Sequence, residues 1–164
     1  MLFRTESRWF ALQVRPGFEL AIASVLKSKG YEEFVPTYSS DEGSRGRVER
    51  PLFPGYIFCR FDSRVHAPIV TTPGVIRIVG YGRTSASLTD SEMQAVRTLA
   101  GSKLPAKPHS YIESGRRVRI REGPLRGAEG DFVQTGDGRY LVASVGLLQR
   151  SIAVEIEPAW LEPV

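Results

Sequence analysis

The segment Pro51–Phe58 constrains the fold most, because large apolar side chains lie on both sides of a Pro-Gly pair. Pro54-Gly55 predicts a tight turn, and the apolar residues after it predict a strand over Tyr56–Phe61. Pro51 donates no backbone hydrogen bond, so the strand Val48–Leu52 is expected to lie at a sheet edge or to end there. Apolar side chains of this size are costly to leave in water. The segment is therefore either core or a docking surface for another macromolecule.

Alternating residues over Arg8–Val14 predict a strand with two distinct faces. After the Pro16-Gly17 turn, apolar residues recur at helical spacing up to Leu26, and Gly30 stands where a left-handed C-cap is expected. Short strands are predicted at 34–36 and 75–79, and 39–47 is predicted to be a polar, mobile loop. The capping-box sequence Thr89–Glu92 predicts the start of a second helix.

These elements predict an α+β domain over residues 1–101, in which an antiparallel sheet has helices packed on it. Period-two alternation places one set of strand residues in the core, and helical spacing places one face of the second helix there. The residues assigned to the core in this way are Ile57, Cys59, Phe61, Met93, Val96 and Leu99.

Residues 102–110 contain two prolines and two lysines and are predicted to be a linker. From Tyr111 onward the sequence changes to short apolar runs separated by glycine turns. Arg117–Arg121 alternates between basic and apolar residues, Gly136-Asp137-Gly138 predicts a hairpin turn, and Ile152–Ile156 alternates again. About five short strands favour a small all-β, SH3-like domain over residues 111–164.

Composition limits the chemistry that this chain can carry. It has 164 residues, 41% of them hydrophobic, which is enough for one medium domain or two small ones. One cysteine and two histidines leave few ligands for a metal ion, so we expect no metal, no cofactor and no catalytic residues. The single cysteine fits a reducing, cytoplasmic setting. No segment approaches the roughly 20 apolar residues that span a bilayer, so we expect no membrane contacts. We also expect a monomer.

The basic excess lies in the N-terminal part of the chain. Residues 1–101 contain 13 basic and 10 acidic side chains, whereas residues 111–164 contain 7 basic and 8 acidic ones. Binding to nucleic acid depends on lysine and arginine that neutralise phosphates. Any contact with a polyanion is therefore expected mainly in residues 1–101.

Two motifs in this order resemble the NusG family of transcription elongation factors over nearly the whole chain. The strand Trp9–Val14, the turn Phe53–Tyr56 and the pair Gly74-Val75 resemble the family's N-terminal domain. The stretch Glu122–Leu125, followed by Gly127 and Gly130, resembles its KOW motif, in which glycines permit tight turns. The resemblance implies a factor that binds RNA polymerase, reduces pausing or termination, and recruits a partner through the KOW domain.

In that family, the N-terminal domain docks on the clamp helices of RNA polymerase. An apolar concave patch suits a helical partner, with binding concentrated in a few aromatic anchors. The resemblance assigns this role here to Trp9, Phe53, Tyr56 and Phe58. The alternative is that Phe53 and Tyr56 only seal a hairpin.

The family's N-terminal domain also passes close to the non-template DNA strand. The matching positions here are Arg15, Lys29 and Thr72, and the alternative is that both cations are solvated surface groups. Pro73 stands where a hydrogen-bond donor is common in relatives, which argues against base-specific reading.

In the KOW domain, 146–150 resembles the loop that contacts a small-subunit ribosomal protein or the termination factor Rho. The resemblance assigns partner binding to Leu147, Leu148 and Arg150, whereas Gln149 replaces a common glycine. Alternatively, the two leucines belong to the core of the domain. The altered Gln149 and the segment 50–55 favour an operon-specific paralogue over a housekeeping factor.

Two other functions compete with this interpretation. A KOW-type RNA-binding or ribosome-associated protein would use the basic face of Arg117, Arg119 and Arg121, although residues 111–164 carry a net negative charge. A cysteine hydrolase would use Cys59 and His66. Cys59 falls on the predicted core face of its strand, and no third orienting group is evident, so we do not expect an enzyme.

Overall fold

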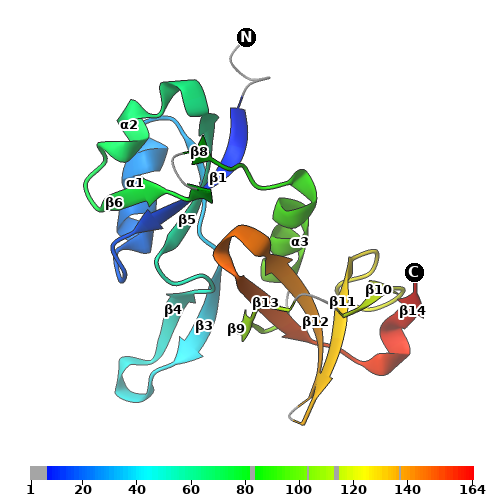
Figure 1. The fold of residues 1–164 in the computed structure, drawn as a ribbon. Coiled ribbons are helices and arrows are strands. Elements are labelled where there is room, and N and C mark those ends of the chain that lie inside the picture. Colours follow the sequence, from blue (N-terminus) through cyan, green and yellow to red (C-terminus); the bar gives the residue numbers. More distant parts are fainter. Residues whose placement is uncertain (1–6, 82–83, 103, 113–114, 137) are drawn as a thin grey trace. The chain divides into compact units, whose positions relative to one another are not determined.

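The structure is a computed structural model that describes residues 7–81, 84–102, 104–112, 115–136 and 138–164 (Figure 1). Its contacts group the chain into two compact units. The first contains the residues up to 35 and residues 53–90, and the second contains residues 36–52 and 91–164. Each unit has its own cluster of buried hydrophobic residues.

The first unit is built on a four-stranded antiparallel sheet in the order β2-β5-β1-β6. The central strands β1 and β5 pair over most of their length, from Ser7 opposite Asp62 to Gln13 opposite Tyr56. The elements of this unit are β1 (Ser7–Val14), α1 (Glu19–Ser28), β2 (Glu32–Phe34), β5 (Tyr56–Asp62), η2 (Ser63–Val65), α2 (Ala67–Val70), β6 (Val75–Ile78), β7 (Gly80–Tyr81) and β8 (Thr84–Ser85).

Helices α1 and α2 cover one face of this sheet, which confirms the predicted α+β class. Alternate residues of β1 and β5 point toward the helices and are almost fully buried, with the rings of Phe10 and Phe61 4.7 Å apart. Period-two alternation correctly predicted which residues of β5 enter this core. The buried residues of the cluster are Phe10, Leu12, Val14, Ile22, Ala23, Leu26, Ile57, Cys59, Phe61 and Ile69.

The Pro54-Gly55 turn is held by two parts of the first unit. Gly55 adopts a φ of +86°, which favours glycine. Its carbonyl accepts from the backbone N–H of Val14 at 2.8 Å, and its own N–H donates to the carboxylate of Glu19 at 2.8 Å. Glu19 is buried at the start of α1 with 3% of its surface exposed. The buried carboxylate of Glu19 thus holds the turn that precedes β5.

We expect Glu19→Ala to lower the free energy of unfolding by about 2–3 kcal/mol, because it leaves the buried N–H of Gly55 without an acceptor. Urea titration followed by circular dichroism measures this loss. Glu19→Gln keeps an acceptor oxygen at nearly the same place and should lose less than half as much. Equal losses in the two variants would show that the bond to Gly55 is not the cause.

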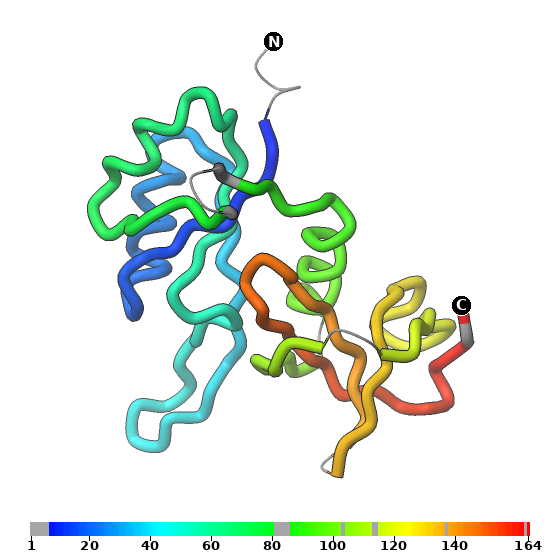
Figure 2. The backbone as a smooth tube through the Cα atoms, in the orientation of Figure 1, coloured from blue at the N-terminus to red at the C-terminus, as the bar shows by residue number. Residues whose placement is uncertain are grey.

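Strands β3 (Thr37–Asp41) and β4 (Arg47–Pro51) form a separate two-stranded hairpin in the second unit, which Figure 2 shows doubling back at its tip. The prediction of a polar loop over 39–47 was therefore wrong, because 39–41 is strand and Gly43–Arg45 forms the short helix η1. Polar cross-strand contacts stabilise the hairpin: Thr37 donates to Glu49 at 2.7 Å, and Arg50 forms an ion pair with Glu42.

The two strands that flank the Pro-Gly turn do not pair with each other. β4 pairs with β3, whereas β5 pairs with β1 and β2. Residues 52–55 therefore connect the β3–β4 hairpin to the four-stranded sheet. Leu52 still donates its backbone N–H to Pro36 at 2.8 Å, which continues the hairpin by one residue.

The second unit contains a six-stranded sheet in the order β14-β10-β11-β12-β13-β9, which we call the C-terminal sheet. The predicted hairpin is confirmed, since Thr135 pairs with Gly138 at its turn, while the predicted turn residue Asp137 lies outside the described residues. The elements are α3 (Asp90–Ala100), β9 (Ala106–Ser110), β10 (Arg116–Ile120), β11 (Glu129–Thr135), β12 (Gly138–Val145), η3 (Gly146–Leu148), β13 (Arg150–Glu155), η4 (Pro158–Trp160) and β14 (Leu161–Pro163).

Part of the predicted linker belongs to this sheet. Residues 106–110, within the linker predicted over 102–110, form β9 and pair with β13 from Val154 opposite Ala106 to Arg150 opposite Ser110. β13 is consequently an inner strand, and four consecutive residues of it are buried instead of alternate ones. Prolines suggested a linker because they cannot donate hydrogen bonds, but an edge strand such as β9 tolerates Pro108.

Candidate docking surfaces

The structure buries three of the four aromatic residues that the sequence assigned to polymerase binding. Phe53 and Phe58 are 1% and 0% exposed, and their rings meet edge to face with centroids 5.3 Å apart. Phe34 adds a third ring, 6.4 Å from Phe58. Trp9 is also buried, with 7% of its surface exposed. The assignment of Trp9, Phe53 and Phe58 as exposed anchors is therefore corrected, because all three side chains are buried.

Tyr56 is the remaining member of that set, and it is half-buried. Strand register places Tyr56 of β5 opposite Gln13 of β1, and Gln13 opposite Arg77 of β6. The guanidinium of Arg77 donates to the side-chain oxygen of Gln13 at 2.7 Å. By alternation this row lies on the sheet face opposite α1. We call Tyr56, Gln13 and Arg77 the tyrosine row.

Period-two alternation along Arg8–Val14 puts Gln13 on the same strand face as Trp9, but the sequence analysis assigned no role to Gln13 or to Arg77. The alternation in β1 was the available signal for Gln13. No comparable signal existed for Arg77, because its position beside Gln13 depends on the register between β1 and β6, which includes an irregularity between Gln13 and Val14.

Of the three residues assigned to DNA contact, two are bonded to each other and the third is exposed. Lys29 and Thr72 do meet, but they bind each other: the ammonium of Lys29 donates to the Thr72 hydroxyl at 2.8 Å and to the Pro68 carbonyl at 3.0 Å. Thr72 is only 2% exposed. These two residues therefore tie the end of α1 to α2, and the assignment of Thr72 as a DNA contact is corrected.

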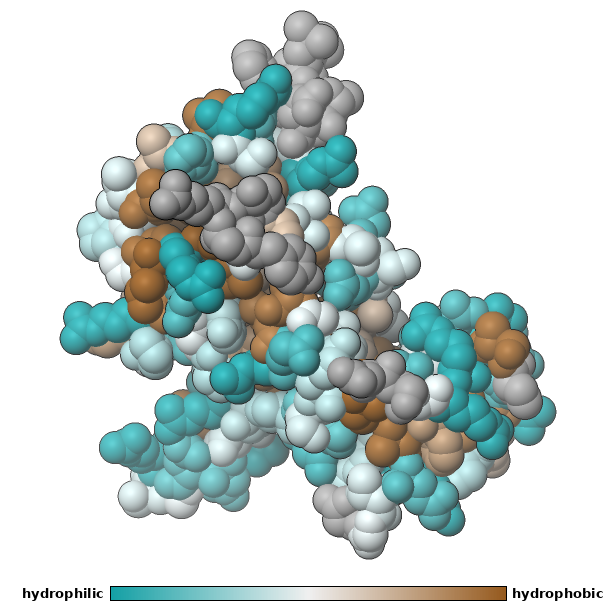
Figure 3. Space-filling model, viewed as in Figure 1, coloured by the Kyte–Doolittle hydropathy of each residue, from teal (hydrophilic) through white to brown (hydrophobic). Residues whose placement is uncertain are grey.

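Arg15 remains exposed, and its guanidinium lies 4.6 Å from the centre of the Phe18 ring. Phe18 is itself 46% exposed, so the pair forms a cation–aromatic contact on the surface. Figure 3 shows apolar surface exposed among polar surface in this unit. Its large exposed apolar residues are Phe18, Leu20, Val25, Val65, Val70 and Ile76.

The loop assigned to partner binding in the second unit forms the short helix η3. Leu148 is buried with 7% exposure and so belongs to the core, as the alternative interpretation held. Leu147 is half-buried and Arg150 is exposed. Gln149 has a φ of 51°, the left-handed conformation, and among the described residues it is the one non-glycine with positive φ. Its side-chain amide donates to the Gly146 carbonyl at 2.7 Å, which fixes this conformation.

The basic face predicted on β10 is largely paired. Arg119 donates to Glu129 at 2.7 Å and lies 3.7 Å from Glu162, and the bond to Glu129 raises the pKa of the Arg119 guanidinium. Arg121 donates to the backbone carbonyl of Ala159 at 3.1 Å. A charge that carboxylates already neutralise, as they do for Arg119, releases fewer counterions when a phosphate approaches. This face therefore suits RNA binding less well than its sequence suggests.

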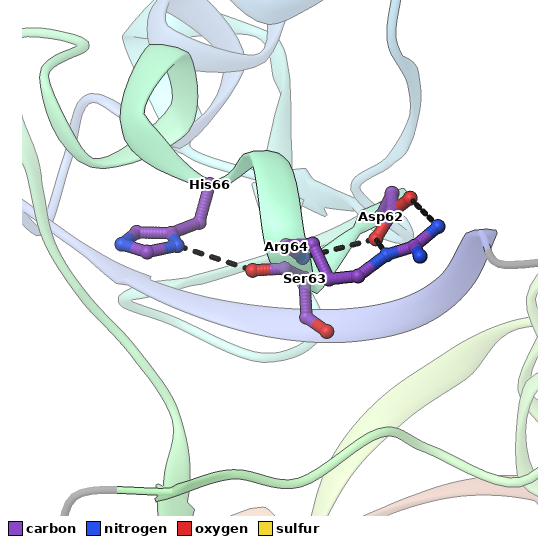
Figure 4. Close-up of polar contacts among 4 residues, drawn as sticks. All are labelled: Asp62, Ser63, Arg64 and His66. Carbon is purple, nitrogen blue, oxygen red and sulfur yellow. Dashed lines mark hydrogen bonds and ion pairs between the residues drawn. The ribbon is translucent and has the colours of Figure 1, made fainter. Parts of the chain in front are cut away.

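Cys59 and His66 do not form a catalytic pair. Cys59 is fully buried, whereas His66 is exposed and its Nδ1 contacts the backbone carbonyl of Ser63 at 3.1 Å (Figure 4). The nearby Asp62 accepts from the guanidinium of Arg64 at 2.8 Å. That bond, with the backbone N–H of Arg64, lowers the pKa of Asp62. The cluster is a local cap for η2.

We expect the thiol of Cys59 to be inert in the folded protein. Burial, reinforced by the nearby Glu33 and Glu32, raises its pKa to about 12, so very little thiolate exists at pH 8. Alkylation by iodoacetamide at pH 8 should be about a thousandfold slower than for an unfolded chain, whose thiol ionises near pH 8.5. Mass spectrometry with and without urea measures both rates. Equal rates would show that Cys59 is accessible.

Among the described residues, no helix is long and apolar enough to cross a membrane. The same part of the chain contains no group of three histidine, cysteine, aspartate or glutamate side chains placed to hold a metal ion.

Comparison with known proteins gives a consistent result. Residues 7–97 match a family model described as transcription termination factor nusG. Two proteins described as transcription termination/antitermination protein NusG are similar over almost the full length. The one from Vibrio parahaemolyticus is 32% identical, with 93% of each chain covered, and the one from Pseudomonas aeruginosa is 30% identical, with 96% of this chain and 98% of the relative covered.

The fold also resembles a solved structure of Thermotoga maritima NusG, described under the name "Domain interaction in Thermotoga maritima NusG". The TM-score is 0.58 and the sequence identity is 20%, with 98% of both chains covered. At this identity the likeness concerns the fold. It agrees with an α+β N-terminal domain followed by a β-rich C-terminal domain.

Proposed function

The chain belongs to the NusG family and is a transcription factor, and from this premise we propose that it binds RNA polymerase and reduces pausing or termination. The observation that carries the proposal is the similarity to NusG proteins over more than nine-tenths of the chain, which includes both the N-terminal domain and the KOW motif. A match to residues 7–97 alone would not support a function for the C-terminal part of the chain, to which we assign the recruitment of a partner.

For polymerase binding we assign the tyrosine row in place of the three buried aromatics. Tyr56 has an apolar ring and a polar hydroxyl, which suits an interface that is partly wet. Arg77 is exposed and is held by Gln13, so its charge is presented in a defined place. The clamp helices of the polymerase, which the family binds, would meet an aromatic anchor flanked by a cation.

Arg15 with Phe18 is the proposed contact to the non-template DNA strand. An exposed guanidinium beside an exposed ring can neutralise one phosphate and stack on one base. Lys29 has a smaller role in this proposal, because its ammonium is already hydrogen bonded within the first unit.

In the second unit, Leu147 and Arg150 are the proposed contacts to a small-subunit ribosomal protein or Rho. Leu148 is left out of this surface because it is buried. Gln149 adopts the backbone conformation that a glycine would adopt without strain, so the loop keeps its shape despite the replacement. We retain the operon-specific paralogue as a prediction for this chain.

Binding of the full chain to purified core RNA polymerase from the same organism tests the proposal. An aromatic anchor at an interface contributes about 2 kcal/mol or more, so Tyr56→Ala should weaken binding by about thirtyfold. Val25→Ala is the matched control: Val25 is 41% exposed on α1, on the other side of the sheet. Unchanged affinity of the Tyr56 variant would contradict the assignment, and no binding by the unmodified chain would contradict the function.

A further inference from the structure

Arg77 keeps most of its hydrogen-bonding capacity for a ligand. It is exposed on the edge strand β6, and its Nε–H donates to the side-chain oxygen of Gln13 at 2.7 Å. Within the part of the chain that the structure describes, this is the one hydrogen bond or ion pair of the guanidinium. Because the bond to Gln13 uses the Nε–H, the N–H groups of the two terminal nitrogens remain for an end-on contact.

A carboxylate is the ligand that fits these two nitrogens. Its two oxygens match two parallel N–H donors of a guanidinium, and such charge-assisted bonds are about twice as strong as neutral ones. A lysine ammonium offers no such fork, because it is a compact point charge. Holding the guanidinium in place before binding also reduces the entropy that is lost on binding. Gln13 and Arg77 together therefore present an ordered site for an aspartate or glutamate side chain.

The tyrosine row also sets the distance between this acidic side chain and the aromatic anchor. Gln13 lies directly opposite Tyr56 on one side and directly opposite Arg77 on the other, so the row crosses three strands. Neighbouring strands are about 4.8 Å apart, which separates Tyr56 from Arg77 by about 10 Å. Two turns of an α-helix span about 10.5 Å and return to nearly the same face. A helix that lies across the strands can therefore contact both ends of the row.

We propose that Arg77 is a specificity-determining residue of the polymerase-binding surface, and that Gln13 is its positioning residue. The ligand is a helix that lies across β5, β1 and β6. It places an apolar residue against Tyr56 and an acidic residue, about two helical turns away, against Arg77. This inference rests on the proposed binding of polymerase, and it adds the direction of the bound helix and the charge that the helix must carry.

Titration of the full chain with purified core RNA polymerase from the same organism tests the role of Arg77. Arg77→Ala should bind about tenfold more weakly, and Arg77→Lys about fivefold more weakly, because lysine keeps the charge without the fork. Arg60→Ala is the matched control, since Arg60 is an exposed arginine on the same face of β5, about 13 Å along the strand from Tyr56. Unchanged binding by Arg77→Ala would overturn its role, and weaker binding by Arg60→Ala would overturn the direction of the helix.

The positioning role of Gln13 is tested by a double-mutant cycle. Gln13→Ala should weaken binding about threefold in the unmodified chain and should have no effect in Arg77→Ala, which has no guanidinium to hold. A residue that only stabilised the sheet would weaken binding equally in both chains, and this result would overturn the positioning role. Urea titration of each variant checks that it is folded under the conditions of the binding assay.

Charge reversal then tests the acidic residue of the partner. Arg77→Glu should bind about a hundredfold more weakly than the unmodified chain, because two carboxylates would face each other. Replacing one acidic residue of the clamp helices with lysine should restore this binding to within about tenfold. If no such polymerase restores binding, the proposal is overturned. If the unmodified chain binds no polymerase, the proposed function is wrong; if only Tyr56→Ala weakens binding, that function stands and the role of Arg77 is wrong.

Discussion

Replacing Phe58 with alanine is expected to lower the free energy of unfolding by about 3–5 kcal/mol, the usual loss for a fully buried phenylalanine. The side chain is 0% exposed and is in contact with the rings of Phe53 and Phe34. Its removal costs both the burial of the ring and the cavity that remains. Chemical denaturation of the full chain, monitored by tryptophan fluorescence and circular dichroism, measures the change.

Tyr56→Ala is the matched comparison on the same strand, two residues away and half-buried. We expect it to cost about 1–2 kcal/mol, because less apolar surface leaves the interior. A Phe58 variant as stable as the unmodified protein would contradict the buried placement and would return Phe58 to the docking surface. This difference also means that a loss of polymerase binding in Phe53 or Phe58 variants reports on folding, whereas the Tyr56 variant reports on contact.

Gly74→Ala is expected to lower the free energy of unfolding by about 2–5 kcal/mol. Gly74 has a φ of +93°, and a Cβ at this position would lie 2.5 Å from Cδ1 of Ile22 on α1. The left-handed conformation costs an alanine about 1–2 kcal/mol, and overpacking a core costs typically 1–3 kcal/mol. Thermal unfolding and urea titration of the full chain give the size of the loss.

Gly30→Ala separates the two causes. Gly30 has a φ of +94°, almost the same as Gly74, but a Cβ there meets nothing within 4 Å. Its alanine variant should therefore lose only the conformational part, about 1–2 kcal/mol. If the two variants lose the same amount, then Ile22 does not crowd Gly74, and the close packing of α1 on the turn before β6 is wrong.

Local patterns correctly predicted which residues are buried where a single strand or helix determines this. Alternation along β1 and β5 correctly assigned Ile57, Cys59 and Phe61 to the core, because successive side chains of a strand point to opposite faces. Helical spacing correctly assigned Met93, Val96 and Leu99 to the buried side of α3 for the same kind of reason. Both results depend only on neighbouring residues.

The errors arose where the answer depends on residues far apart in sequence. From the sequence, Phe53 and Phe58 could be either core residues or exposed anchors, because both faces of this sheet carry apolar residues. The packing of their rings in the structure shows that they are core residues. Lys29 and Thr72 lie 43 residues apart, so their mutual hydrogen bond has no local signal. The pairing of β4 with β3 depends on register and cross-strand contacts such as Thr37 to Glu49.

A single-round transcription assay tests the central claim most directly. Polymerase from the same organism is halted, released and scored for pausing and terminator read-through with no added factor, with the unmodified chain, with Tyr56→Ala or with Val25→Ala. We predict more read-through with the unmodified chain and with Val25→Ala, and a loss of that increase with Tyr56→Ala. Read-through that is the same in all four reactions, on templates with and without strong pause sites, would contradict the account.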